Sequence, residues 1–296
     1  MMGGLGNQMF QYAFGIALSA KNKSNVCFDL SFYDDQVERH DFTPRKLALD
    51  VFRLKLPKVS DSELSKFKKL VKPIKFADKC YSVLYGKKYY LESSPHFDVN
   101  IDKISNNTYC EGYFQDERYF QNVSEEIRSA FTFANNSFER DSEIQRLANE
   151  ITSSNSVCIH IRRGDYITNP INTEIFGTLS KDYYLKGIDH IEKTINSKTK
   201  KFLFSNDPEW CKETFGEYSD ITIIDEKYSG SNGTSHFWLM TKCKHFIIAN
   251  SSFSWWAAWL GNEHNKIICR PFPWFTKNEF KSASMCPDSW VKIRRD

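Results

Sequence analysis

The sequence has no pair of cysteines spaced as C-x-x-C, although it contains eight cysteines in 296 residues. They are widely spread, and several lie inside apolar runs, such as Cys27 and Cys269. This distribution is typical of buried thiols in a reducing compartment and argues against a disulfide framework or a zinc site. The sequence also lacks an apolar run of 18 residues and a signal-peptide pattern at its N-terminus. We therefore expect a cytoplasmic protein.

Motifs for nucleotide phosphates and metals are missing as well. The absence of G-x-x-x-x-G-K-[ST] argues against a P-loop kinase or ATPase. The absence of D-x-D removes the usual carboxylate pair for a metal held against a diphosphate, so we expect no metal and no cofactor. The net charge of +3 is too small to favour nucleic acid as a partner. The lysine-rich stretch 66–75 is interpreted as a solvated helix face, with a weak peripheral membrane contact as the alternative.

The second half of the chain alternates short apolar runs with helical periodicity. This pattern predicts an α/β fold with a parallel, doubly wound sheet. We place the domain boundary at 153/154, which gives domains 1–153 and 154–296. We expect the proline- and aromatic-rich C-terminal tail to pack back on the first domain. The predicted strands are 157–161, 201–205, 221–224, 245–249 and 266–269, and the predicted helices are 181–195, 207–215, 235–242 and 252–260.

The first half is less regular. A turn containing Gly3, Gly4 and Gly6 precedes a helix, and such a turn lets backbone N–H groups approach an anion. It is not a G-x-G-x-x-G fingerprint, because Met9 stands where the last glycine should be. Close packing of the helix on a sheet is an equally open interpretation. Further along we predict strands at 26–30, 88–92 and 108–115, and helices at 61–71, 117–131 and 139–152.

Polar residues follow three of the predicted strands in the second half, at 160–165, 205–207 and 250–254. The carboxyl ends of parallel strands share one edge of a sheet, so these residues are expected to meet there. Arg162 and Arg163 suit a diphosphate, because each guanidinium can form a forked pair with phosphate oxygens. Ser251 and Ser252 would add a helix N-terminus to the same site. The structural alternatives are an Arg–Asp ion pair and ordinary N-capping.

Four blocks of sequence together resemble the bacterial α-1,2-fucosyltransferases of glycosyltransferase family 11. They are Gly3–Tyr12, His160–Tyr166, Phe204–Asp207 and Cys243–Trp256, and they span nearly the whole chain. The resemblance implies a GT-B type fold, with two Rossmann-like domains facing across a cleft and GDP-fucose held mainly by the second. It also implies an inverting, metal-independent transfer of L-fucose to the O2 hydroxyl of a galactose.

The resemblance also assigns roles to single residues. Arg162 matches the arginine that neutralises the leaving GDP diphosphate, and His160 belongs to the same motif. His236 stands where related enzymes often carry an acidic residue that reads guanine, which leaves that contact open. Family members usually have a strand before the first glycine turn, so either the sequence begins late or another strand takes its place. The donor-binding candidates are Gly6, Asn7, Gln8, Arg163, Asn206, Asp207, His236, Ser251, Ser252, Phe253 and Ser254.

The acceptor hydroxyl needs a base, and a carboxylate is the natural choice. Asp165 is the first candidate, with an ion pair that orients Arg162 or Arg163 as the equal alternative, and Glu174 is the second candidate. The acceptor itself would be a galactose-terminated oligosaccharide or a lipid-linked glycan lying against the first domain. Its candidate contacts are Asp34, Asp35, His40 and the segment 111–115, for each of which a solvated loop or a buried strand is the commoner explanation.

A protein of this type would build O-antigen or capsule units at the inner face of the inner membrane. Two other functions remain open: a transferase for another nucleotide sugar, and a non-catalytic glycan-binding module. The intact segment 162–165 argues against the binding module, which has no need for arginines that neutralise a diphosphate.

Overall fold

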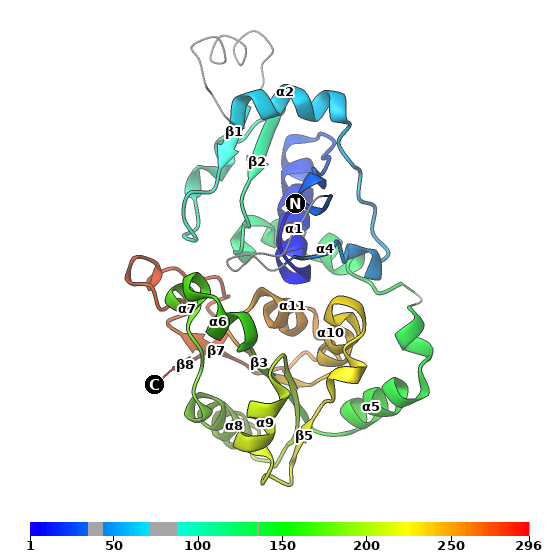
Figure 1. Cartoon of the computed structure of the whole chain (residues 1–296), viewed down its shortest axis with the longest axis vertical. Helices are drawn as coiled ribbons and strands as arrows, with labels where there is room; N and C mark the ends of the chain where they lie inside the picture. The colour runs from blue at the N-terminus through cyan, green and yellow to red at the C-terminus, as the bar shows by residue number, and fades with distance from the viewer. Residues whose placement is uncertain (35–43, 72–87, 135, 296) are drawn as a thin grey trace. The chain divides into compact units, whose positions relative to one another are not determined.

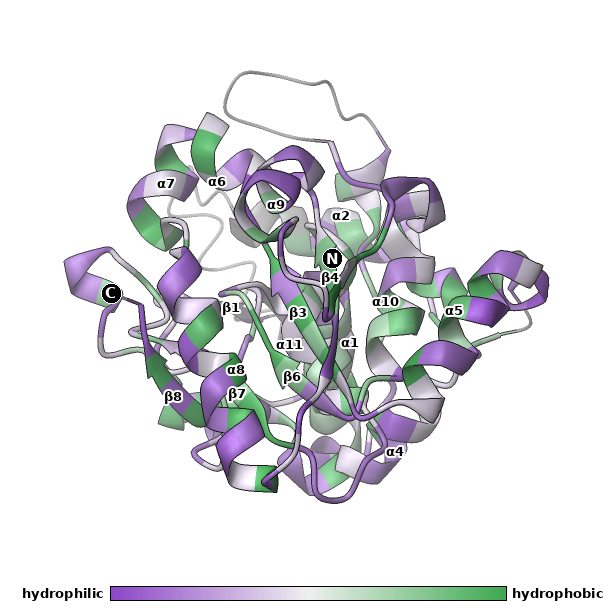
Figure 2. Cartoon of the chain, turned by 90° about the horizontal axis from the view of Figure 1, so that it is seen from below, coloured by the Kyte–Doolittle hydropathy of each residue, from purple (hydrophilic) through white to green (hydrophobic). Residues whose placement is uncertain are grey.

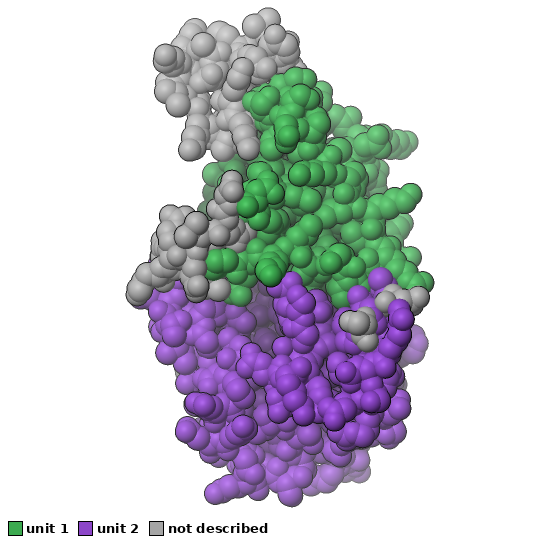
Figure 3. Space-filling view, turned by 45° about the vertical axis from the view of Figure 1, so that its right-hand side comes forward, with its two compact units in different colours: residues 1–37, 44–132 green, residues 38–43, 133–296 purple. Residues whose placement is uncertain are grey.

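The structure is a computed structural model, and it describes residues 1–34, 44–71, 88–134 and 136–295. The chain forms two compact units, coloured separately in Figure 3. Unit 1 comprises Met1–Val37 and Pro44–Thr132, and unit 2 comprises Glu38–Thr43 and Phe133–Asp296. Of the predicted acceptor contacts, Asp35 and His40 lie outside the described residues.

Unit 2 is built on a six-stranded parallel sheet with the order β5-β4-β3-β6-β7-β8. The chain therefore adds strands outward from β3 on one side, then crosses over and adds β6, β7 and β8 on the other. This order confirms the predicted doubly wound sheet and puts its switch point between β3 and β6. The strands are β3 (Ser156–Ile161), β4 (Lys200–Ser205), β5 (Ile221–Ile223), β6 (His245–Ile247), β7 (Ile268–Phe272) and β8 (Val291–Arg294).

Helices cover the sheet on both faces (Figure 1). On one face, Tyr183 and Tyr184 of α8 and Phe215 of α9 are buried against β3, β4 and β6. On the other face, α10 packs against α5 and α11. Figure 2 shows the apolar strands β3 and β6 running between helices whose outer residues are hydrophilic. The helices are α5 (Ser142–Ser153), α6 (Gly164–Thr168), α7 (Pro170–Phe176), α8 (Lys181–Ile195), α9 (Pro208–Phe215), α10 (Thr234–Thr241) and α11 (Ser252–Leu260).

Several segments of unit 2 differ from the sequence-based expectations. The stretch after β3, for which the sequence analysis predicts no helix, forms α6 and α7. Asn169 caps α7, and Pro170 occupies its first turn. The helix expected at 139–152 begins at Ser142, where Asp141 accepts hydrogen bonds from two N–H groups of the first turn. The last strand was not predicted from the C-terminal tail, yet the tail forms β8 and completes the sheet of its own unit.

The compact units change over between Thr132 and Phe133, ahead of the boundary expected at 153/154. Helix α5 belongs to unit 2 because it packs against α10. The segment leading into α5 also packs within unit 2, where the ring of Phe138 lies 5.8 Å from that of Trp238.

Unit 1 contains a long helix and a small parallel sheet among its described residues. The sheet pairs β1 (Lys88–Leu91) with β2 (Thr108–Glu111). The helices are α1 (Leu5–Asn22), α2 (Asp61–Val71) and α4 (Ser124–Ala130). The core beside α1 is aromatic, and the rings of Phe14 and Phe114 stack with centroids 3.7 Å apart. None of the helices in the described parts of the two units is both long and apolar enough to cross a membrane.

Three expectations for unit 1 are wrong in detail. The strand expected at 26–30 is reduced to a single parallel bridge between Phe28 and Lys58, because Asp29 accepts a hydrogen bond from the N–H of Ser31 and the chain turns. The strand expected at 108–115 ends at Glu111. The helix expected at 117–131 is two 3-10 turns followed by α4, since the backbone at Phe120 (φ −137°, ψ 10°) is not α-helical.

Candidate functional site

The two arginines of the candidate site follow the end of β3, a strand buried along its whole length. Arg162 follows it directly and forms an ion pair with Asp165, with Nη2 and Oδ1 2.7 Å apart. The guanidinium also lies 5.7 Å from the ring centre of Tyr166. Both members of the ion pair keep roughly a fifth of their side-chain surface exposed, 23% for Arg162 and 18% for Asp165. The arginine is therefore held in one orientation while part of its surface stays open to a ligand.

Arg163 is held by the end of the neighbouring strand β4. Its Nε donates to Oδ2 of Asp207 over 3.0 Å, and its guanidinium stacks 4.3 Å above the ring of Trp210. Its backbone N–H donates to Oδ1 of Asn206 over 3.0 Å. Asp207 also caps α9 by accepting from the N–H of Trp210. Asn206 and Asp207 thus hold the segment Arg162–Arg163, called the arginine loop below, in place. The sequence analysis did not predict this role for them.

Gly164 lies close to Asn206, the residue that directly follows β4. A Cβ atom built on Gly164 would lie 2.2 Å from Nδ2 of Asn206. A side chain here would displace the amide end of Asn206, whose Oδ1 accepts from the backbone N–H of Arg163. This close approach explains why a glycine follows the two arginines.

The second half of the site is the start of α11, which follows the end of β6. Ser251 is the N-cap residue, but its side chain makes no capping hydrogen bond. The ordinary N-capping that would explain this serine is therefore not its role. The first N–H groups of a helix have no partner within the helix, so this terminus is suited to an anion. Ser254 differs, because its buried hydroxyl donates back to the carbonyl groups of Ala249 and Ser251.

A hydrogen-bond chain joins the two halves. Tyr166, which follows the arginine loop, donates its hydroxyl to the carbonyl of Asn250 over 2.9 Å. Asn250 in turn donates its amide to the carbonyls of Phe176 and Trp274. Arg295 of the C-terminal segment donates to the same two carbonyls. The sequence analysis did not name these positioning residues as site residues, although Tyr166 and Asn250 lie within the motifs it used.

His160 lies on β3 and is buried, with its ring 5.8 Å from that of Phe253. Burial, with the nearby charge of Arg162 and His236, lowers its pKa to about 3. The imidazole is therefore neutral at physiological pH, and its Nδ1 has no hydrogen-bond partner among the described residues. His236 is also buried, its Nε2 lies 3.1 Å from the carbonyl oxygen of Asp225, and burial lowers its pKa.

The candidates in unit 1 lie in the first turn of α1. Gly6 is buried, and Oδ1 of Asn7 accepts from Nε2 of Gln115 over 2.6 Å. Gln8 is buried with its amide engaged inside the unit: Nε2 donates to the carbonyls of Gly3 and Lys46, and Oε1 accepts from the N–H of Ala48. The side chain of Gln8 therefore has a structural role, because its hydrogen bonds hold the glycine turn in place.

The two carboxylates considered as a base have different environments. Asp165 is paired with Arg162 on the loop itself. Glu174 of α7 keeps 65% of its side-chain surface exposed and lies 3.7 Å from Nζ of Lys277. The ion pair of Asp165 agrees with the orienting role that was the alternative to proton transfer.

With this geometry in hand, comparison with known proteins is decisive for the family. The family model "Glycosyl transferase family 11" matches residues 1–294. The chain belongs to glycosyltransferase family 11. Members that resemble it include an alpha-1,2-colitosyltransferase of Escherichia coli, 34% identical over 100% of this chain and 98% of that protein. The O-antigen biosynthesis glycosyltransferase WbnK of Escherichia coli is 32% identical over 99% of both proteins.

More distant similarities extend beyond bacteria. Galactoside alpha-(1,2)-fucosyltransferase 1 of Rattus norvegicus is 26% identical to this family 11 chain, over 99% of this chain and 72% of the rat protein. Among solved structures, NodZ alpha-1,6-fucosyltransferase soaked with GDP-fucose aligns with a TM-score of 0.48 and 11% identity, over 87% of this chain and 89% of NodZ.

Proposed function

We propose that this family 11 enzyme transfers L-fucose from GDP-fucose to the O2 hydroxyl of a terminal galactose, with inversion and without a metal. The observation that supports the proposal is that two groups suited to a diphosphate are joined at the switch point of unit 2. There Arg162 at the end of β3 is joined through Tyr166 and Asn250 to the serine-rich start of α11. Ligands of open α/β sheets bind at this kind of crevice.

The chemistry follows from where charge develops. As fucose leaves GDP through an oxocarbenium-like state, negative charge builds up on the β-phosphate. Arg162 and the N–H groups at the start of α11 would stabilise that charge, because both are positioned before the reaction begins. Arg163 would contribute to the same anion from the β4 side while Asp207 and Trp210 hold its guanidinium. With two guanidiniums available, the leaving group needs no metal ion.

Inversion requires the acceptor hydroxyl to attack the face of the sugar opposite GDP. Asp165 remains the first candidate for the base, but its ion pair with Arg162 favours an orienting role. His160 would serve the donor as a neutral group, since its low pKa excludes it as a general acid at neutral pH. The remaining assignments, including the guanine contact at His236 and the phosphate contacts of Asn7, Ser252 and Phe253, belong to the same proposal.

A second donor deserves a direct comparison, because one of the relatives described above is a colitosyltransferase. Colitose is fucose without the 3-hydroxyl group, so both sugars present the same diphosphate to Arg162. The difference lies in a single hydroxyl of the sugar, and the diphosphate site described above does not discriminate between them. GDP-colitose is therefore the alternative donor to test beside GDP-fucose.

The setting of the reaction is part of the proposal. Similarity to an O-antigen biosynthesis enzyme supports a glycan acceptor of that kind, either a galactose-terminated oligosaccharide or a lipid-linked glycan. A lipid-linked acceptor would bring the enzyme to the inner face of the inner membrane as a peripheral protein in the cytoplasm.

The test is an assay of GDP release in the presence of EDTA. The protein is incubated with GDP-fucose or GDP-colitose, each with and without lactose, and the trisaccharide product is identified by mass and linkage analysis. We expect acceptor-dependent GDP release with GDP-fucose and a new α-1,2 linkage on galactose. Turnover with GDP-colitose alone would assign the other donor. Absence of GDP release with every galactoside, together with no binding of GDP, would overturn the enzyme assignment.

A further inference from the structure

Three lysine or arginine side chains are buried among the described residues of unit 2, and they differ in how their charge is compensated. Lys201 lies 2.7 Å from the carboxylate of Glu192, and Arg295 donates hydrogen bonds to three backbone carbonyls. Arg270 of β7 is only 1% exposed, and its enclosed Nε has no hydrogen-bond partner among the described residues. A guanidinium stays charged in proteins, and a buried charge is costly unless it is paired. Arg270 therefore offers hydrogen-bond donors that no described group of the protein uses.

The residues around Arg270 on the two last strands of the sheet add more positive charge. In the register of β7 and β8, Arg270 lies opposite Lys292, and Phe272 lies opposite Arg294. The ring centre of Phe272 is 5.9 Å from the guanidinium carbon of Arg270 and 5.6 Å from Nζ of Lys292. These four residues form a group that we call the β7–β8 cluster: Arg270, Phe272, Lys292 and Arg294.

The β7–β8 cluster lies on the face of the sheet opposite α8. Cys269 of β7 and Ile293 of β8 belong to the core around α8. Successive side chains of a strand point to opposite faces, so the residues of the cluster point away from that helix. On this other face Lys292 and Arg294 are exposed, and Phe272 keeps 45% of its surface open to solvent. The cluster is therefore accessible from solvent next to the buried arginine.

The cations of the cluster also differ from those of the proposed donor site. Arg162 is paired with Asp165, and Arg163 is paired with Asp207. In the described part of the chain, by contrast, no carboxylate lies within ion-pair distance of any of the three cations of the cluster. The cluster therefore presents three positive charges that a single ligand can neutralise together.

Protection of the sheet edge accounts for only part of this arrangement. β8 is the outermost strand of the sheet (Figure 2), and charged residues on an edge strand prevent pairing with other chains. That explanation covers Lys292 and Arg294. It does not cover Arg270, which lies one strand further in and is buried.

We propose that the β7–β8 cluster is a phosphate-binding site, separate from the strand ends of β3 and β6 that form the proposed donor site. A phosphate group fits the cluster better than a carboxylate, because it carries more negative charge and its oxygens accept from several cations at once. Arg270 would hold the phosphate from below, while Lys292 and Arg294 would hold it from the solvent side. Two sources have this chemistry, the headgroup of an anionic phospholipid and a soluble phosphate ester.

The first measurement is thermal unfolding of the full chain with and without inorganic pyrophosphate. Saturating GDP is present throughout, so that the proposed donor site is already occupied, and its binding is measured separately. Pyrophosphate well above its Kd should raise Tm by about 3 °C or more. The rise should be lost in the double variant Lys292→Gln/Arg294→Gln. If GDP does not bind, the donor proposal fails by itself, and the comparison of variants still locates the pyrophosphate site.

The matched control removes the same charge elsewhere in unit 2. It is the double variant Lys193→Gln/Lys198→Gln, in which each lysine is exposed and lies within 2.9 Å of a carboxylate. Because these charges are already paired, the rise in Tm with pyrophosphate should persist. Equal loss in both double variants would mean that pyrophosphate responds only to net charge, and it would overturn the proposal.

A third variant tests the buried arginine itself. Arg270→Met removes a buried charge that has no partner and keeps an apolar side chain of similar length. Without pyrophosphate its Tm should therefore equal or exceed that of the wild type, while the rise with pyrophosphate should be lost. A purely structural arginine predicts the opposite, a lower Tm with the rise preserved, and that result would overturn the proposal.

Sedimentation with phospholipid vesicles separates the two sources of phosphate. If the source is a lipid headgroup, the protein should bind vesicles of phosphatidylglycerol and phosphatidylcholine in equal parts, but not phosphatidylcholine alone. The double variant Lys292→Gln/Arg294→Gln should then bind about tenfold more weakly at low ionic strength, and the lysine control should bind normally. A response to pyrophosphate without vesicle binding would assign a soluble phosphate ester. Binding of neither probe would overturn the proposal.

Discussion

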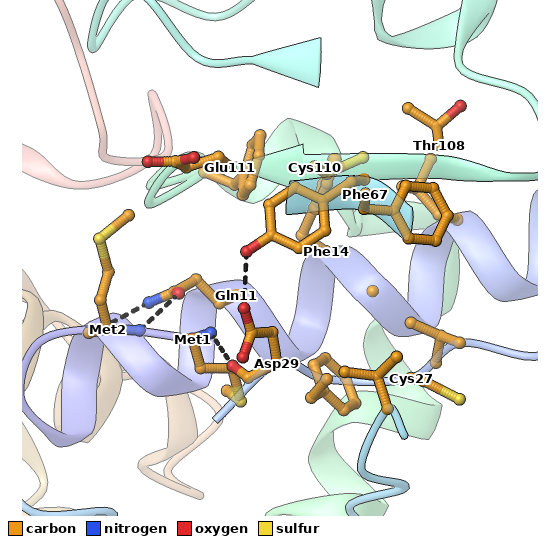
Figure 4. A pocket seen from close by; sticks show the side chains of 18 of the residues that line it. Met1, Met2, Gln11, Phe14, Cys27, Asp29, Phe67, Thr108, Cys110 and Glu111 are labelled. Carbon is orange, nitrogen blue, oxygen red and sulfur yellow. Dashed lines mark hydrogen bonds between the residues drawn. The ribbon is translucent and has the colours of Figure 1, made fainter. Parts of the chain in front are cut away.

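Both units contain helices and a parallel sheet, but the described sheet of unit 1 is much smaller than that of unit 2. In unit 2 the strands around the switch point are paired, and the strand ends next to it carry the charged and hydroxyl groups of the site. In unit 1 the described sheet has two strands, and the long helix α1 lies against a cavity of about 770 Å³. The paired strands of unit 2 hold the functional groups in fixed positions, whereas the two-stranded sheet described in unit 1 leaves a cavity beside α1 (Figure 4).

Each unit also contains a local Arg–Asp pair, and the contrast shows how context decides what such a pair does. In unit 1, Arg118 binds Asp116 with Nη2 and Oδ2 2.5 Å apart, and 51% of the arginine side chain is exposed. Asp116 also caps the 3-10 turn that follows it. In unit 2, Arg162 is only 23% exposed and stands at the switch point beside α11. Chemically similar pairs thus stabilise a 3-10 turn in one unit and a candidate anion site in the other.

The largest effect is expected from Arg162→Ala. Removing one preorganised charge from the leaving diphosphate should lower kcat by about 10²–10³-fold. The matched variant Arg118→Ala in unit 1 should change kcat less than about twofold, because Arg118 belongs to none of the candidate donor contacts and half of its side chain faces solvent. Steady-state kinetics with GDP-fucose and lactose measure both. Near-normal turnover of Arg162→Ala would show that the reaction does not need this arginine. The two Arg–Asp pairs would then not differ in function.

A smaller effect is expected from Asp165→Asn. The asparagine oxygen can still accept from Arg162, so an orienting role predicts a loss of about tenfold, with the shape of the pH–rate profile preserved. Asp165→Ala removes the acceptor altogether and should lose more than Asp165→Asn. If Asp165 is the general base, both variants should lose about 10²–10⁴-fold and the acidic limb of the profile should disappear. The comparison of the two variants therefore decides between the roles left open by the sequence.

The parts of the molecule that the sequence predicts well are those whose signal is local. Helix α8 begins and ends at the expected residues, because Ser180 caps its first turn by accepting from the N–H of Tyr183 and apolar residues recur at helical spacing. Helix α11 also has the expected bounds, as a short apolar run in which most residues are buried. The strand β3 and the two arginines after it were also predicted together, since a buried run that ends in two arginines is a strong pattern. The doubly wound order follows from the regular alternation of strand and helix.

The parts of the molecule that the sequence predicts poorly depend on contacts with residues far away in the chain. The strand expected at 26–30 fails because the chain at Pro57–Val59 offers it only one bridge. The strand β8 has no strong pattern of its own and forms because β7 presents an edge for it. In the site, Asn206 and Asp207 were expected as ligand contacts, yet their bonds to Arg163 cross between two strands and cannot be read from either segment alone.

The smallest expected effect is on stability at acidic pH, and it comes from His160, a buried histidine of unit 2. The pKa of His160 falls from 6.5 to about 3 on folding, chiefly by burial. Between these two values the unfolded chain binds a proton that the folded chain does not. Stability from this group is therefore complete above about pH 6.5 and is lost as the pH falls, at no more than ~1.4 kcal/mol per pH unit.

The measurement is urea unfolding of the wild type and His160→Gln from about pH 8 to about pH 4. The difference in unfolding free energy between the two proteins should be constant above pH 6.5 and should shrink steadily below it. A pH-independent difference for His160→Gln would mean that folding leaves the pKa of His160 unchanged, and it would remove the argument that burial keeps the imidazole neutral beside Arg162.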